Sequence, residues 1–77
     1  MARAQYFLVK NQSGWCVKLM GEQYGPYSSQ EVAMKAALAA AQKAGEMGHQ
    51  AEIVVQGTDN KFRTHWTYED YRRSIAS

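Results

Sequence analysis

The sequence has few of the residues on which crosslinks and catalytic sites depend. Its 77 residues include one cysteine and one proline. Cys16 has no partner for an internal disulfide, so we expect a protein of a reducing compartment, the cytoplasm. No apolar run is long enough to cross a membrane, and residues 1–9 lack the apolar core of a signal peptide. These absences predict a protein without a membrane partner.

An excess of charge is also missing. Nine Lys and Arg residues against seven Asp and Glu residues give a net charge of +2, which is too small to indicate nucleic acid by itself. A chain of this length buries only about 60% of its unfolded surface and has little room for an enclosed active site. We therefore expect a single domain over residues 1–77, frayed at residues 1–4 and 74–77, that works through its surface.

Catalytic motifs are absent as well. The sequence has no glycine-rich phosphate loop and no nucleophile elbow. Cys16 has no predicted histidine partner, and His49 and His65 are too few for a closed zinc site. The sequence thus predicts no enzyme activity, no metal and no cofactor, and no small-molecule substrate is evident.

One long segment, residues 28–48, has helical periodicity. Ser28 and Glu31 fit a capping box at its start, and Gly45 and Gly48 are candidates for its left-handed end. One face of this helix consists of methyl groups, which predicts close packing against large side chains of a sheet. This face is expected to carry Ala33, Ala37, Ala40 and Ala44.

The remaining segments have the composition of strands and turns. Residues 5–10 and 15–20 predict one hairpin and residues 51–57 and 61–67 a second, whereas residues 21–29 predict a turning segment without regular pairing. The tail from Tyr68 predicts one helical turn capped by Thr67. The expected fold is a single α+β domain with the order β-β-α-β-β, in which one alanine-rich helix packs across a four-stranded antiparallel sheet.

The alternation of side chains along these strands predicts which of them face the helix. Those predicted to face it include Phe7, Val9, Trp15, Val17, Ile53, Phe62, Thr64 and Trp66. The opposite face then becomes the candidate interaction surface, with Tyr6, Leu8, Lys18, Met20, Val54, Arg63 and His65.

Two functions are compatible with this surface. Apolar side chains such as Leu8 and Val54 on a small domain favour a protein partner or self-association, which is the main expectation. The ring of Tyr6 beside cations such as Lys18 favours single-stranded nucleic acid as the alternative, although the ribonucleoprotein signature is absent.

Three short motifs connect this sequence with a known family. They are Gly-Trp-x-Val-Lys at residues 14–18, Gly-Pro-Tyr at 25–27 before the alanine-rich helix, and Phe-Arg-Thr-x-Trp-Thr-Tyr at 62–68. Over residues 5–68 the chain resembles the bacterial domain-of-unknown-function family 2188. The resemblance implies a bacterial source and a compact module. It implies no functional residue, because the family has no established activity.

Overall fold

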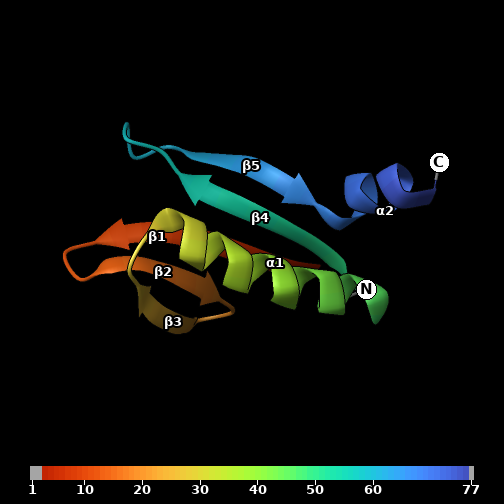
Figure 1. The fold of residues 1–77 in the computed structure, drawn as a ribbon, viewed down its shortest axis with the longest axis horizontal. Coiled ribbons are helices and arrows are strands. Elements are labelled where there is room, and N and C mark those ends of the chain that lie inside the picture. Colours follow the sequence, from red (N-terminus) through yellow and green to blue (C-terminus); the bar gives the residue numbers. More distant parts are fainter. Residues whose placement is uncertain (1–2, 77) are drawn as a thin grey trace.

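Five strands and two helices make up the structure, a computed structural model that describes residues 3–76 (Figure 1). In chain order the elements are β1 (Arg3–Asn11), β2 (Gly14–Leu19), β3 (Glu22–Tyr27), α1 (Gln30–Glu46), β4 (Gln50–Gln56), β5 (Phe62–Thr67) and α2 (Tyr68–Ala76). The strands form one sheet in the order β3-β2-β1-β4-β5. The prediction of a single α+β domain is confirmed, but the sheet has five strands rather than four, and there are two helices rather than one.

The additional strand, β3, reverses the directions in which α1 and β4 run, relative to the predicted fold. Residues 21–29 were expected to turn without pairing, because Gly25 and Pro26 are turn residues. Residues 22–27 of this segment instead pair with β2 as strand β3. Gly25 and Pro26 lie where the β2–β3 register shifts, between the pairs Trp15–Tyr27 and Val17–Tyr24. At the edge of a sheet, the missing N–H of a proline leaves no hydrogen bond unmade.

Three strands in succession place the start of α1 at the opposite end of the sheet from the start of β1. The helix then carries the chain back, so β4 runs parallel to β1, with Tyr6 opposite Ile53 (Figure 1). The prediction of an all-antiparallel sheet is therefore wrong. All other strand pairs in the described chain are antiparallel.

The ends of α1 are capped by the chemistry expected, with a shift of one residue at the start. The N-cap is Ser29 rather than Ser28, and its hydroxyl accepts a hydrogen bond of 3.2 Å from the Val32 N–H. After the helix, Gly48 adopts a φ of 95°, and its N–H donates to the Gly45 carbonyl at 3.0 Å. The predicted end of the helix near Gly48 is confirmed.

The packed face of α1 differs from the predicted one. Its buried residues repeat every four positions, and Ala40, which was expected in this stripe, is exposed. Seven alanines between residues 33 and 44 make the face ambiguous in the sequence, because Ala40 and Ala41 are equally small. The buried stripe consists of Ala33, Ala37, Ala41 and Gly45.

Helix α2 extends the predicted single turn to Ala76. The Asp70 N–H donates to Thr67 Oγ1 at 3.2 Å, as the predicted cap requires, and Glu69 pairs with Arg73 at 2.7 Å. The fraying expected at both ends concerns, in part, residues 1–2 and 77, which lie outside the described residues. No helix of the described chain is long and apolar enough to span a bilayer.

Candidate functional site

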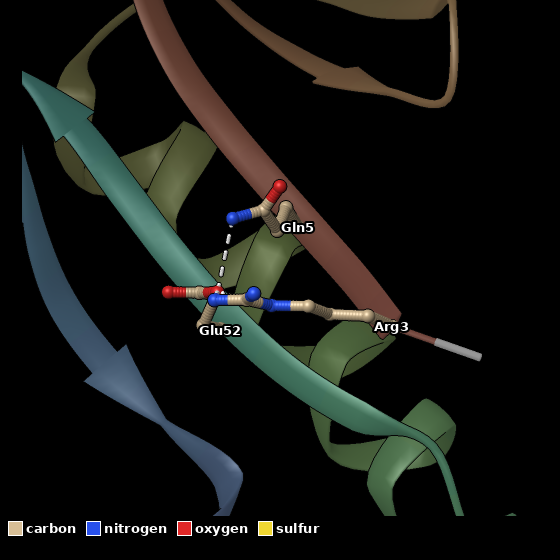
Figure 2. Close-up of polar contacts among 3 residues, drawn as sticks. All are labelled: Arg3, Gln5 and Glu52. Atoms are coloured by element: carbon tan, nitrogen blue, oxygen red, sulfur yellow. Dashed lines mark hydrogen bonds and ion pairs between the residues drawn. The ribbon is translucent and has the colours of Figure 1, made fainter. Parts of the chain in front are cut away.

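The side of the sheet away from the helices is the candidate site. Helix α1 packs over β1, β2 and β4, and α2 contacts β4 and β5, so both helices contribute to the same core (Figure 1). Figure 2 views the sheet from its other side, with α1 behind β1 and β4. No element within residues 3–76 covers this side, which we call the open face.

Strand β1 contributes different residues to the open face than the sequence indicated. Tyr6 is 5% exposed and Leu8 is fully buried, because both point into the core beneath α1. Phe7 and Val9 consequently lie on the open face. The predicted placement of these four residues is wrong, since residues 6–9 are all apolar and offer no alternation to set the phase.

The turn between β1 and β2 held the missing signal. Asn11 pairs with Gly14 across a two-residue loop, and this register places Leu8 opposite Val17. Paired residues in an antiparallel ladder point to the same side of the sheet. Closing the hairpin in this way would have assigned Leu8 to the side of Val17, which was predicted correctly to face the helix.

A β-bulge corrects the prediction for β5. Trp66 pairs with Ile53 whereas Thr64 pairs with Val54, so His65 is an additional residue between them. A bulge reverses the alternation beyond it. Trp66 therefore faces the core as predicted, but Phe62 and Thr64 lie on the open face instead of the helix side.

The same bulge moves two residues of the predicted surface, Arg63 and His65, to the helix side. Arg63 lies opposite Val55, a core residue, and its Nη2 is 2.9 Å from Oδ2 of Asp59 in the hairpin loop. The Arg63 guanidinium and the backbone N–H of Lys61 lower the pKa of Asp59 to about 2. His65 borders a depression beside the first turns of α1. Neither residue belongs to the open face, contrary to the prediction.

The centre of the open face is apolar and partly aromatic. The rings of Phe7 and Phe62 meet edge to face, with centroids 5.8 Å apart and an interplanar angle of 89°. Phe62 remains 48% exposed. Val54 is 7% exposed and lies on β4, between β1, which carries Phe7, and β5, which carries Phe62. Val54 was predicted here, whereas Phe7, Val9 and Phe62 were missed for the reasons given above.

A polar cluster lies on one side of this centre (Figure 2). Glu52 Oε1 accepts hydrogen bonds from two residues of β1. Arg3 donates to it through Nε at 2.9 Å and through Nη2, and Gln5 donates through Nε2 at 3.0 Å. Partial burial alone would raise the pKa of Glu52, but hydrogen bonds from Arg3, Gln5 and Thr64 together lower it below its ordinary value. The charge of Arg3 is thus largely balanced within the open face.

The other side of the centre carries the remaining predicted residues. Lys18 pairs with Phe7 across the β1–β2 ladder and is exposed, and Met20 is 87% exposed in the following turn. Both border a depression of about 500 Å³ that also includes Phe7 and Gln23. Within the described chain, Lys18 is the basic residue of this face that has no acidic side chain paired to it.

Cys16 lies on the open face but is only 1% exposed. The side-chain amides of Asn11 and Gln23 approach its sulfur at 3.2 and 3.4 Å and cover it. Residues 3–76 contain no group of three His, Cys, Asp or Glu side chains arranged as metal ligands. The chemistry that the open face can offer is apolar contact with a polar rim.

Glu52 makes the stability of the fold dependent on pH. A carboxyl whose pKa is lowered in the folded state stabilises the fold above its unfolded pKa, near 4.5, and loses this contribution as the pH falls through the folded value. At pH 7 we expect Glu52→Gln to lower the free energy of unfolding by on the order of 1 kcal/mol. The difference between wild type and variant should shrink below pH 4.5 in urea denaturation.

Glu46→Gln is the matched control, because Glu46 is exposed at the end of α1. A constant difference between wild type and Glu52→Gln from pH 7 to pH 3 would contradict the assignment.

Comparison with known proteins yields one finding. A model of the family described as "Uncharacterized protein conserved in bacteria (DUF2188)" matches residues 6–68. No curated protein and no solved structure matches the chain. The match extends from the core residue Tyr6 to Tyr68 at the start of α2, and so includes α1 and all but the first residues of the sheet. The chain therefore belongs to the DUF2188 family of bacterial proteins.

Proposed function

We propose that the protein is a non-enzymatic module that associates with a second copy of itself through the open face. The observation that carries this proposal is the exposed aromatic centre formed by Phe7 and Phe62 on a side of the sheet that no described element covers. Exposed apolar patches on small domains usually mark interaction sites. An aromatic centre with a polar rim is the usual anatomy of a protein interface.

The size of the face supports a partner that covers it as a whole. The chain measures 39 × 22 × 20 Å along its principal axes, and the sheet is spread across the two longer ones (Figure 1). A stable interface of standard size buries about 800 Å² on each partner. A face of these dimensions is large enough for one such contact.

The distribution of charge supports a second copy in particular. A two-fold interface brings the same patch against itself, so both signs must be present in its rim. Lys18 on β2 and Glu52 on β4 lie on opposite sides of β1. A two-fold axis along β1 brings Lys18 of each copy towards Glu52 of the other.

The alternative is single-stranded nucleic acid, which stacks its bases on exposed rings of an open sheet. Phe7, Phe62 and Lys18 favour it. The positions of Arg63 and His65 on the helix side do not favour it, because the charge of Arg63 is then removed from the side of the sheet on which the phosphates would lie. We therefore rank this function second.

The test compares two aromatic residues of similar exposure on opposite sides of the sheet. Phe62 is 48% exposed on the open face and Tyr24 is 45% exposed on the helix side. We expect Phe62→Asp to weaken association at least tenfold in analytical ultracentrifugation, because a carboxylate would be buried unpaired at the contact, and Tyr24→Asp to leave it unchanged.

Val54→Asp is unsuitable for this test, because Val54 is only 7% exposed in the monomer and the change would disturb folding. Two results together would favour the alternative. The wild-type protein would be monomeric and bind a labelled oligonucleotide, and Lys18→Gln would reduce the slope of log K against log salt by roughly 0.7.

A further inference from the structure

A second concave surface lies on the helix side, between α1 and the edge strand β3. It has a volume of about 320 Å³, near the lower end of the range for small-molecule sites. The groove exists because α1 contributes only the methyl groups of Ala36, Ala37 and Ala40 to its lining. Its lining includes Leu19, Ala36, Ala40 and the rings of Tyr6, Tyr24 and Tyr27.

Three tyrosines from two strands border this groove, and hydrogen bonds hold the hydroxyls of two of them, Tyr6 and Tyr24. The Tyr6 hydroxyl donates to the Ala40 carbonyl at 3.3 Å. The Tyr24 hydroxyl donates to Glu22 Oε2 at 2.6 Å. The aromatic ring pairs of the described chain involve other residues, so these three rings do not stack on one another.

The charge near the groove is negative. Glu22 does not itself line the groove, but it lies opposite Leu19 in the β2–β3 ladder and its carboxylate accepts the hydrogen bond of Tyr24, which places that charge at the rim. No Lys, Arg or His is among the residues that line it. The hydrogen bond to Glu22, together with the charge of that carboxylate, raises the pKa of Tyr24. The phenol therefore stays neutral at physiological pH.

We propose that this tyrosine groove binds a methylated ammonium group. The faces of electron-rich rings attract cations, and quaternary ammonium ions lose little hydration when they enter such a site. The alanine and leucine side chains suit the methyl groups, and Glu22 complements the charge. A simple ammonium would instead need several hydrogen-bond acceptors, which the lining does not provide.

The proposal does not rest on association through the open face, because the tyrosines of the groove lie on the opposite side of the sheet, although Glu22 also borders the depression beside Lys18. Methylated ammonium groups occur in small molecules such as choline and on trimethylated lysine side chains. Both sources present the same chemistry to the groove.

The test uses choline and its neutral isostere, 3,3-dimethylbutan-1-ol, in which carbon replaces the nitrogen. Binding is followed by amide shifts in two-dimensional NMR. We expect choline to shift the amides around Tyr24, Tyr27 and Ala40, and to bind about tenfold more tightly than the isostere, because only the cation is attracted by the rings. Equal affinities, or no shifts with choline, would overturn the proposal.

Variants separate ring chemistry from folding. Tyr24→Leu should weaken choline binding about fivefold to tenfold, whereas Tyr24→Phe retains the ring and should lose less. Phe62→Leu is the matched control on the open face, with similar exposure, and should bind like wild type. Wild-type affinity in Tyr24→Leu would refute the site.

A peptide that contains trimethyl-lysine forms the last arm. Tighter binding of this peptide than of choline supports the site and assigns it to a protein ligand, and the reverse order supports the site and assigns it to a small molecule.

Discussion

Gly45→Ala is expected to destabilise the fold by about 1–3 kcal/mol, although the same change in most helices stabilises them. Gly45 is buried in the last turn of α1, and a Cβ built on it would lie 2.2 Å from Cγ of Tyr68. The ring of Tyr68 packs against the core and against Trp66 and Tyr71. Relieving the clash has to displace this ring or α2, which disturbs these packing contacts.

The sign of this effect is the informative part. Where nothing obstructs the methyl group, replacing a helical glycine by alanine stabilises by about 1 kcal/mol. Chemical denaturation of Gly45→Ala should therefore be compared with Glu46→Ala, an exposed position one residue later that we expect to change stability by less than about 0.5 kcal/mol. A stabilised Gly45→Ala would show that α2 does not dock on α1 at this point.

Leu8→Ala should cost about 2–5 kcal/mol of folding stability, because Leu8 is fully buried between the sheet and α1. Its neighbour Phe7 lies on the open face and is only partly buried. Phe7→Ala should cost clearly less in the folding of the monomer, yet weaken association.

The pair of variants thus distinguishes the observed phase of β1 from the opposite one. Thermal unfolding at low protein concentration measures the first effect, and sedimentation measures the second. If Phe7→Ala destabilised the monomer more than Leu8→Ala, Phe7 rather than Leu8 would face the core, which contradicts the observed orientation of β1.

The sequence predicted those elements whose local signals agree with one another. Strand alternation placed Trp15 and Val17 correctly, and Thr67 and Gly48 were recognised as caps because capping depends on nearby residues alone. Periodicity also placed Ile53 on the helix side. In each of these cases the information lies within a few positions of the residue concerned.

The errors arose where a distant partner decides the structure. The turn-forming residues Gly25 and Pro26 concealed β3, since only pairing with β2 makes this segment a strand. The bulge at His65 depends on the register with β4 and cannot be seen in the alternation of β5 itself. These two features determine the direction of β4 and the composition of the open face, so most of the candidate site was beyond prediction from the sequence.

The most direct test of association through the open face observes contact between two copies. A nitroxide is attached to Met20→Cys, a position 87% exposed beside Lys18 and Phe7, while Cys16 is only 1% exposed and stays unlabelled. The nitroxide-labelled protein contains no ¹⁵N and is mixed with ¹⁵N-labelled wild type without nitroxide. Every broadened signal then reports the approach of one molecule to another.

With a two-fold axis along β1, we expect broadening of the amides of Val54 and Thr64, on the far side of the open face. Broadening confined to α1, or none at concentrations where the protein is dimeric, would contradict it.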